Sequence, residues 1–304
     1  MMLKSWKPST LKQYKVYLNK WLKFCSSLGK NPLKRNILRK LEFLRKLFNK
    51  ENLGYSAINT ARSALSCIFD SPPFGEEPLV IRFMKSIYNT RPSLPRYTET
   101  WDVSRVLTFL EAWSPGRFLS RRQLSFKLAT LLILVSGQRV QTIHALNINN
   151  MYIDDNSVTF TLDTLIKQSS VHNLSGRTIV IPKYDKNKKI CPVTCLKQYL
   201  KRTERERKNP QLFISTQLPY KPVAKSTISR WIKCTLNLSG INTEKYKTHS
   251  SRSAVSSAAA KTIDLAAIMK AAGWSRASTF AAFYNKEIEQ DNKTAFGKAV
   301  LDRK

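Results

Sequence analysis

Acidic residues are scarce in this chain of 304 residues. Asp and Glu number 20 against 52 Lys and Arg, which leaves a formal net charge of +32 at pH 7. Glycine and proline are also few, at 9 and 13, so the chain is not a low-complexity polymer. With 42% hydrophobic and 10% aromatic residues, it has the material for a packed core. A folded protein with this charge is expected to bind a polyanion.

Cysteines, histidines and long apolar runs are scarce as well. The five cysteines are odd in number and scattered, which argues against a disulfide framework and favours a reducing compartment. None of the three histidines lies near Cys191 and Cys195, so we expect no structural zinc there. The first residues lack the apolar segment of a signal peptide, and the most apolar stretch, Leu128 to Val135, is far shorter than a membrane span. We therefore expect a soluble protein.

The basic charge is spread along the whole chain. Residues 1–97 hold 19 basic and five acidic side chains, and residues 98–304 hold 33 and 15. Both parts are therefore expected to face the same polyanion, for which nucleic acid is the natural candidate. General solubility is the alternative explanation, but acidic residues serve that purpose better.

Apolar periodicity divides the chain into two predicted domains. Residues 1–88 show successive helical stripes, and residues 89–99 contain two prolines without apolar periodicity, which predicts a linker. Residues 100–304 are mixed, because two alternating segments, 157–164 and 177–182, predict short strands among helices. The predicted fold class is mainly α with a small antiparallel β-sheet.

The residues that usually hold a catalytic metal or a nucleotide are missing. The only adjacent acids in the second predicted domain are Asp154 and Asp155, in a predicted turn, and a Gly-rich phosphate loop is absent. If this chain breaks a phosphodiester, it must use a side-chain nucleophile, fixed cations around the phosphate and an acid for the leaving oxygen.

The segment THSSR at 248–252 offers part of such a set. His249 and Arg252 are three residues apart at the predicted start of a helix, so they share one face, where free N–H groups already favour an anion. By itself this pattern is equally consistent with a solvated helix start. The surrounding motifs are what favour a functional site.

Five motifs follow one another along the chain: SGQR with Arg139, a lysine between the two predicted strands, HSSR, GW with Trp274, and FYN with Tyr284. In this order and spacing they resemble the tyrosine recombinase/integrase family. The resemblance covers nearly the whole chain, because residues 1–88 look like the helical core-binding domain that clamps DNA in that family. The cluster TFAAFYN, with Trp274 where many members have His, is most similar to recombinases of DIRS-type and Crypton-type eukaryotic elements.

The resemblance implies a role for each residue around the phosphate. Arg139 and Arg252 would clamp the scissile phosphate, because guanidinium groups match its oxygens and stay charged. His249 would hydrogen-bond the phosphate and take the phenolic proton. Trp274 would donate its indole N–H to a non-bridging oxygen.

The resemblance also implies which residues make and break bonds. Tyr284 would attack and leave a 3′-phosphotyrosyl bond, from which a 5′ hydroxyl religates without ATP. Lys167 would protonate the departing 5′ oxygen. The alternative for Tyr284 is an aromatic core stripe with Phe280 and Phe283. Alternative lysines near the strand ends are Lys183, Lys186, Lys188 and Lys189.

Two positions depart from the family pattern. Thr142 stands three residues after Arg139, where many members carry an acid. The interval from Trp274 to Tyr284 is one residue longer than the commonest spacing, so Phe283 occupies the usual place of the nucleophile. Phe283 has no hydroxyl, and Tyr284 therefore stays the candidate.

Taken as a whole, the resemblance implies a site-specific DNA recombinase or integrase of a mobile element. Its partner would be double-stranded DNA, it would need no cofactor, and its working assembly would be a homotetramer on two duplexes. The apolar residues of the tail after Tyr284 would either pack on their own domain or dock on a neighbouring subunit. A monomeric type IB topoisomerase and an inactive DNA-binding remnant are the alternative functions. In a eukaryotic host the expected compartment is the nucleus, and otherwise the cytoplasm or nucleoid.

The first prediction is that DNA cleavage needs no divalent metal. Since the sequence offers no carboxylate cluster to hold Mg²⁺, EDTA should leave the single-turnover cleavage rate unchanged. Parallel reactions with added Mg²⁺ are the control. A chemical step that strictly requires Mg²⁺ would contradict the mechanism.

Overall fold

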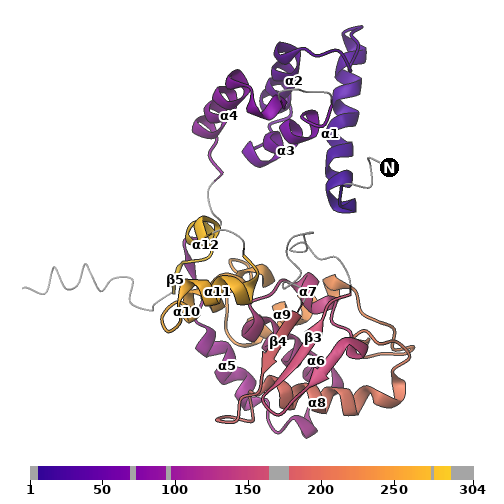
Figure 1. The fold of residues 1–304 in the computed structure, drawn as a ribbon, viewed down its shortest axis with the longest axis vertical. Helices are drawn as coiled ribbons and strands as arrows, with labels where there is room; N and C mark the ends of the chain where they lie inside the picture. Colours follow the sequence, from indigo (N-terminus) through magenta and orange to yellow (C-terminus); the bar gives the residue numbers. More distant parts are fainter. Residues whose placement is uncertain (1–5, 69–72, 94–96, 164–177, 275–276, 289–304) are drawn as a thin grey trace, which may run out of the picture. The chain divides into compact units, whose positions relative to one another are not determined.

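The chain divides into two compact units, Met1–Pro95 and Arg96–Lys304. Each unit has its own apolar core, and their boundary falls within the predicted linker 89–99. The predicted acid Lys167 and the tail beyond residue 288 lie outside the described residues. The computed structural model describes residues 6–68, 73–93, 97–163, 178–274 and 277–288 (Figure 1).

The first unit is helical. Its elements are α1 (Pro8–Ser27), α2 (Ile37–Asn49), α3 (Tyr55–Leu65), the 3₁₀ turn η2 (Phe74–Glu76) and α4 (Pro78–Thr90).

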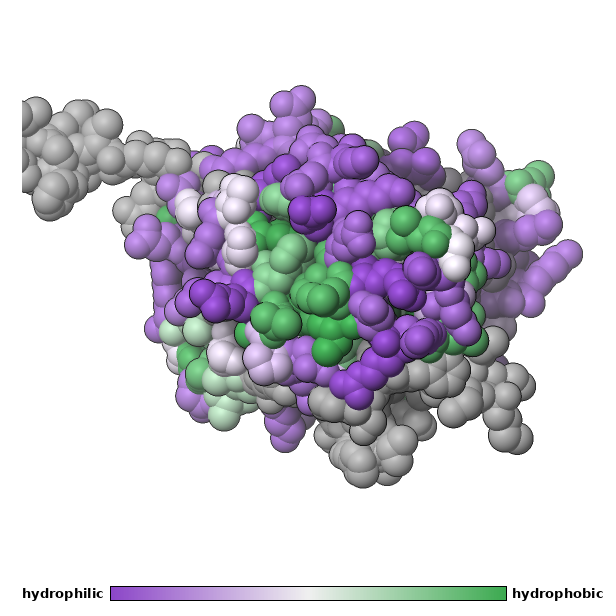
Figure 2. Space-filling view, turned by 90° about the horizontal axis from the view of Figure 1, so that it is seen from above, coloured by the Kyte–Doolittle hydropathy of each residue, from purple (hydrophilic) through white to green (hydrophobic). Residues whose placement is uncertain are grey.

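An aromatic cluster forms the centre of the first unit. The Trp21 and Phe43 rings meet edge to face with centroids 5.5 Å apart, and the Phe24 ring lies 5.5 Å from that of Phe43. The Trp21 indole also donates a hydrogen bond to the carbonyl oxygen of Pro32 at 3.1 Å. Most charged residues of these amphipathic helices are exposed or partly exposed, whereas Lys40 of α2 is buried. One face of the molecule accordingly shows mostly hydrophilic residues around a central hydrophobic group (Figure 2).

The second unit is built from helices around a small sheet. Its helices and 3₁₀ turns are α5 (Val103–Ala112), η3 (Gly116–Phe118), α6 (Arg121–Ser136), α7 (Val140–His144), η4 (Ile148–Asn150), α8 (Pro192–Thr203), η6 (Glu204–Glu206), α9 (Lys225–Leu238), η7 (Thr248–Ser250), α10 (Ser251–Ala259), α11 (Leu265–Ala272) and α12 (Ala277–Phe283). No helix among the described residues is long and apolar enough to cross a membrane.

Helix α6 forms the centre of the second unit. Twelve of its 16 residues are buried, because α8, α9, α10 and strand β4 (Thr178–Pro182) all pack around it. It starts with a capping box, in which the Ser120 hydroxyl accepts from the Gln123 N–H and the Gln123 side chain accepts from the Ser120 N–H. It ends at Gly137, whose φ of 59° lies in the left-handed region.

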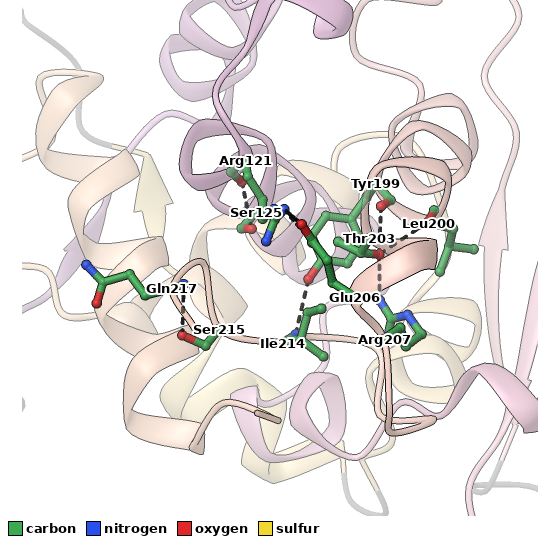
Figure 3. A network of polar contacts seen from close by, with 10 residues as sticks. All are labelled: Arg121, Ser125, Tyr199, Leu200, Thr203, Glu206, Arg207, Ile214, Ser215 and Gln217. Carbon is green, nitrogen blue, oxygen red and sulfur yellow. Dashed lines mark hydrogen bonds and ion pairs between the residues drawn. The ribbon is translucent and has the colours of Figure 1, made fainter. Parts of the chain in front are cut away.

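A polar network attaches the start of α6 to the end of α8 (Figure 3). Arg121 forms an ion pair with Glu206. Arg207 donates to the Thr203 hydroxyl at 2.9 Å, and the Tyr199 hydroxyl accepts from the Ile214 N–H at 3.1 Å. Polar contacts therefore hold the start of α6. The candidate site described below lies at its other end.

The main sheet is antiparallel, with the order β2–β3–β4. It consists of β2 (Met151–Ile153), β3 (Ser157–Thr161) and β4. Its inner face buries Val158 opposite Ile181 and Phe160 opposite Ile179. The predicted fold class, mainly α with a small antiparallel sheet, is confirmed; the sequence reading missed the three-residue strand β2.

A second, two-stranded sheet joins distant parts of the chain. Strand β1 (Glu99–Thr100) pairs in parallel with β5 (Glu287–Ile288), with Glu99 opposite Glu287. Directly after β1, Trp101 is 1% exposed and donates its indole N–H to the Ser250 hydroxyl at 2.9 Å. The segment that follows the linker is thereby attached to two regions more than a hundred residues away.

The second prediction concerns this tryptophan. Trp101→Phe removes the hydrogen bond to Ser250 and leaves a cavity, so the free energy of unfolding should fall by about 2 kcal/mol. Trp113→Phe is the matched control, since Trp113 is only partly buried and should lose less than about 1 kcal/mol. Urea denaturation followed by circular dichroism measures both. Equal losses in the two variants would show that the Trp101 hydrogen bond contributes nothing.

Candidate active site

Two glycine-terminated helix ends lie side by side in the second unit. Helix α6 ends at Gly137, with a φ of 59°, and α11 ends at Gly273, with a φ of 67°. A Cβ atom added at Gly137 would stand 3.5 Å from the Cβ of Ala272, so the two turns lie close together. Arg139 follows the first turn and Trp274 follows the second. The left-handed turns therefore bring these two side chains to the same place.

Arg252 connects the two turns. Its side chain is 1% exposed; Nη1 donates to the Gly137 carbonyl at 2.6 Å and Nη2 donates to the Ala272 carbonyl at 3.1 Å. Gln138 adds a third bond, from its Nε2 to the Ala271 carbonyl at 2.7 Å. Because Arg252 lies in the first turn of α10, three segments far apart in the sequence meet at its guanidinium group.

The electrostatics of this point favour an anion. Burial, followed by the nearby positive charge of Arg139, lowers the pKa of Arg252 to about 10. Arg252 therefore remains charged at pH 7, although two like charges in a desolvated site repel each other. An anion bound between them would relieve that repulsion.

Three buried N–H groups at the site lack a partner. Arg139 Nη1, Arg252 Nε and Trp274 Nε1 make no hydrogen bond to any part of the chain that the structure describes. A buried donor without a partner costs roughly 1–3 kcal/mol. Because all three are donors, the ligand that would satisfy them carries acceptor oxygens, as a phosphate does.

Tyr284 packs against this donor set. Its ring centroid lies 4.6 Å from that of Trp274 and 5.5 Å from the guanidinium carbon of Arg252. Arg252 in turn lies 4.7 Å over the Trp274 ring. The Tyr284 ring is only partly buried, and so its hydroxyl can meet a ligand from solvent.

His249 lies next to the Tyr284 hydroxyl. Its Nε2 is 3.5 Å from the Tyr284 oxygen, and the side chain is exposed. This distance is long for a hydrogen bond, but it places an imidazole where it can receive the phenolic proton once the two groups approach. His249 belongs to η7, which Trp101 attaches to strand β1 through Ser250.

The structure brings together five of the six predicted site residues: Arg139, His249, Arg252, Trp274 and Tyr284. The sixth, Lys167, belongs to the connection between β3 and β4, which lies outside the described residues. The alternative aromatic-core interpretation describes Phe280 well, since it is 5% exposed with its ring 5.4 Å from that of Trp274. Tyr284 differs because its hydroxyl faces His249.

The alternative lysines lie at the other end of the sheet. Thr161 pairs with Thr178 where the connection containing Lys167 begins and ends, whereas Ser157 pairs with Pro182 at the opposite end. Lys183 directly follows Pro182 and forms an ion pair with Asp185 at 3.2 Å. Residues 183–189 therefore follow the end of β4 that lies opposite to the Thr161–Thr178 pair.

The sequence reading missed Gln138 as part of the site. Its side chain is 4% exposed and bonds to the end of α11, but a glutamine before an arginine carries no local signal of such a contact. Thr142, at the position where many family members have an acid, is buried in α7. Its N–H donates to the Arg139 carbonyl at 2.8 Å.

Comparison with known proteins identifies a family for the second unit. The sequence model of the phage integrase family matches residues 98–290. No curated protein matches the chain at a significant level.

Three solved structures show the same fold at low sequence identity. XerH site-specific recombinase, in a post-cleavage complex with palindromic difH substrate, is 16% identical with a TM-score of 0.62, over 96% of this chain and 78% of that one. The Tn1549 transposon integrase with transposon right end DNA is 13% identical with a TM-score of 0.57, over 95% and 93%. A lambda integrase tetramer bound to a Holliday junction is 16% identical with a TM-score of 0.52, over 94% and 75%.

The third prediction separates the two arginines of the site. Arg252→Ala breaks the bonds to the Gly137 and Ala272 carbonyls, so the free energy of unfolding should fall by about 3 kcal/mol. Arg139→Ala removes a like charge beside Arg252. In this variant the free energy of unfolding should fall by less than about 1 kcal/mol or should rise. Urea denaturation without DNA or phosphate tests both variants. Equal destabilisation would mean that Arg139 is a structural residue.

Proposed function

The chain belongs to the phage integrase family and is a tyrosine-type recombinase that acts on DNA, and we propose that Tyr284 is its nucleophile. One observation carries this proposal: among the described residues, three buried donors, Arg139 Nη1, Arg252 Nε and Trp274 Nε1, have no hydrogen-bond partner. Two of these side chains pack against Tyr284, whose hydroxyl faces a histidine, and the third lies near Arg252. A phosphate of the DNA backbone would satisfy the donors and present its phosphorus to the Tyr284 oxygen.

The proposed reaction exchanges one phosphoester for another. The Tyr284 oxygen attacks the phosphorus, the bond to the 5′ oxygen breaks, and a 3′-phosphotyrosyl bond forms. His249 takes the phenolic proton, and Lys167 supplies a proton to the departing 5′ oxygen. Attack by a 5′ hydroxyl on the same phosphorus reverses the steps and rejoins the strand without a nucleotide cofactor.

The cations of the site would make this attack feasible at neutral pH. The Tyr284 hydroxyl must give up its proton as its oxygen bonds to the phosphorus. Arg139 and Arg252 would stabilise the negative charge that develops on the phosphate oxygens, and Trp274 would add a neutral donor. Fixed donors of this kind act strongly because they need no reorganisation when the charge appears.

The two units would divide the work on DNA. We assign residues 1–88 as a helical clamp domain and residues 100–304 as the catalytic domain, joined by the linker 89–99. Support comes from the positive charge of both parts, since 19 basic against five acidic residues fall within residues 1–97 alone. Each phosphate that a cation neutralises strengthens binding and steepens its salt dependence.

We further propose that the enzyme works as a homotetramer on two duplexes and serves the integration of a mobile element. The fold resembles a lambda integrase tetramer on a Holliday junction and a transposon integrase. The cluster TFAAFYN with Trp274 supports a DIRS-type or Crypton-type element, which would place the enzyme in a eukaryotic nucleus. The family match does not favour a type IB topoisomerase. The other alternative, an inactive DNA-binding remnant, would form no covalent adduct with DNA, so an adduct assay tests it.

The fourth prediction tests the nucleophile. Tyr284→Phe keeps the ring that packs on Trp274 but lacks the attacking oxygen, so it should bind DNA normally and form no covalent complex. The measurement is a denaturant-resistant protein–DNA adduct on nicked DNA from the element's own termini. Tyr246→Phe, which changes another tyrosine of the same unit, is the control and should keep forming the adduct. A normal adduct yield from Tyr284→Phe would refute the assignment.

The fifth prediction tests the general acid. A strand with a 5′-bridging sulfur has a leaving group that departs without a proton. Lys167→Ala should therefore cleave ordinary DNA about 10²–10⁴-fold slower than the unmodified enzyme and recover most of the rate on the sulfur strand. Lys186→Ala and Lys188→Ala are the controls. Rescue in those variants, but not in Lys167→Ala, would move the role to the residues that follow β4.

A further inference from the structure

The hydroxyl group of Ser257 contacts the backbone of the proposed nucleophile, Tyr284, and that of Lys286 two residues after it. Ser257 lies in α10 and is 5% exposed. Its Oγ donates to the carbonyl oxygen of Tyr284 at 2.9 Å and accepts from the N–H of Lys286 at 2.9 Å. A serine hydroxyl has one proton to donate, and here that proton is used on the Tyr284 backbone.

Helix α10 therefore connects the phosphate-binding residues to the nucleophile. Arg252 and Ser257 lie five residues apart on this helix, or about 7.5 Å along its axis. Arg252 presents its guanidinium group to the phosphate site, and Ser257 holds the backbone from which the Tyr284 ring projects. Helix α10 thus connects the proposed phosphate-binding group directly to the backbone of the proposed nucleophile.

The local contacts of Tyr284 are weaker constraints. Its N–H and that of Asn285 both bond to the Phe280 carbonyl, at 2.8 and 3.0 Å, which only continues α12. This helix has seven residues, and a helix of that length has little stability of its own. Its orientation must come from contacts with the rest of the unit.

The residues after Tyr284 are attached at a second place. Glu287 and Ile288 pair with β1, and the Lys286 ammonium group lies 4.4 Å from the centroid of the Tyr97 ring and donates to the Tyr97 carbonyl. These contacts hold the segment two to four residues downstream of the nucleophile. Among the described residues, Ser257 is the contact from outside α12 that bonds to the backbone of Tyr284 itself.

We infer that Ser257 is a positioning residue for the cleavage reaction, because its hydroxyl fixes the backbone of Tyr284 relative to Arg252. The inference rests on the proposed role of Tyr284 as the nucleophile. Ser257 touches neither the phosphate nor the attacking oxygen, and its effect passes through the placement of the tyrosine.

Three variants separate the hydrogen bonds from packing. Ser257→Ala removes both bonds, and Ser257→Cys keeps the volume but has only a weak donor and acceptor. Both should slow single-turnover adduct formation about 10- to 100-fold, because a small misplacement of a reacting group has effects of this size. Ser257→Thr retains the hydroxyl and should stay within a few-fold of the unmodified enzyme. Ser256→Ala, which removes the neighbouring buried serine of the same helix, is the matched control and should cleave normally.

Two further readouts distinguish positioning from a general loss of structure. DNA affinity and melting temperature of Ser257→Cys should match those of Ser256→Ala, so that the loss falls on the rate of the covalent step alone. The 5′-bridging sulfur strand should not rescue Ser257→Ala or Ser257→Cys, because the misplaced group is the nucleophile and not the acid.

The inference fails if Ser257→Ala and Ser257→Cys cleave at the unmodified rate, if the sulfur strand restores them, or if their DNA affinity falls in proportion to the rate. These outcomes are separate from failure of the proposed function. If Tyr284→Phe forms the adduct, Tyr284 is not the nucleophile. If Tyr284→Phe forms no adduct but Ser257→Ala and Ser257→Cys cleave normally, only the role of Ser257 is refuted.

Discussion

The guanidinium group of Arg252 holds together the segments that form the candidate site of the second unit. It donates to the carbonyl of Gly137 at the end of α6 and to that of Ala272 at the end of α11. Helix ends leave carbonyl groups without partners, and a buried cation with several donors can satisfy two such ends at once. Once both turns are held against one side chain, Arg139 and Trp274 necessarily lie close together. The same side chain therefore shapes the site and takes part in it.

This arrangement gathers energetically unfavourable groups in one place. Arg252 is buried beside a second guanidinium group, and its pKa falls to about 10 as a result. Three N–H donors are buried without partners among the described residues. A folded protein tolerates such defects only where something else compensates them, and active sites are where they gather. A phosphodiester would supply negative charge and acceptor oxygens together, so binding of DNA and relief of these defects become one event.

The proposed nucleophile, Tyr284, is held in a different way from the two arginines. Arg252 and the two glycine turns form a rigid cage, whereas Tyr284 follows a seven-residue helix and its ring is partly exposed. Its placement depends on contacts with α10 and on the pairing of β5 with β1. In the proposed reaction the tyrosine must bond to the phosphate and later release it. Fixed arginines beside a tyrosine that is held only at its backbone suit such a reaction.

The partner class, the two longer strands and the family could be predicted from residues and their spacing. Charge predicts a polyanionic partner, alternation predicts the strands at 157–164 and 177–182, and the order of Arg139, HSSR, GW and Tyr284 identifies the family. These signals are local, because the period of a helix or strand and the chemistry of a side chain depend on neighbouring residues.

The contacts that assemble the site are not local. The bonds of Arg252, Gln138 and Ser257 all end on backbone carbonyls of distant segments, and any residue type offers that same carbonyl. The pairing of β1 with β5 likewise joins two-residue strands with no pattern of their own. Only the packing of the chain around α6 decides which carbonyls come within reach, and so only the tertiary structure could show them.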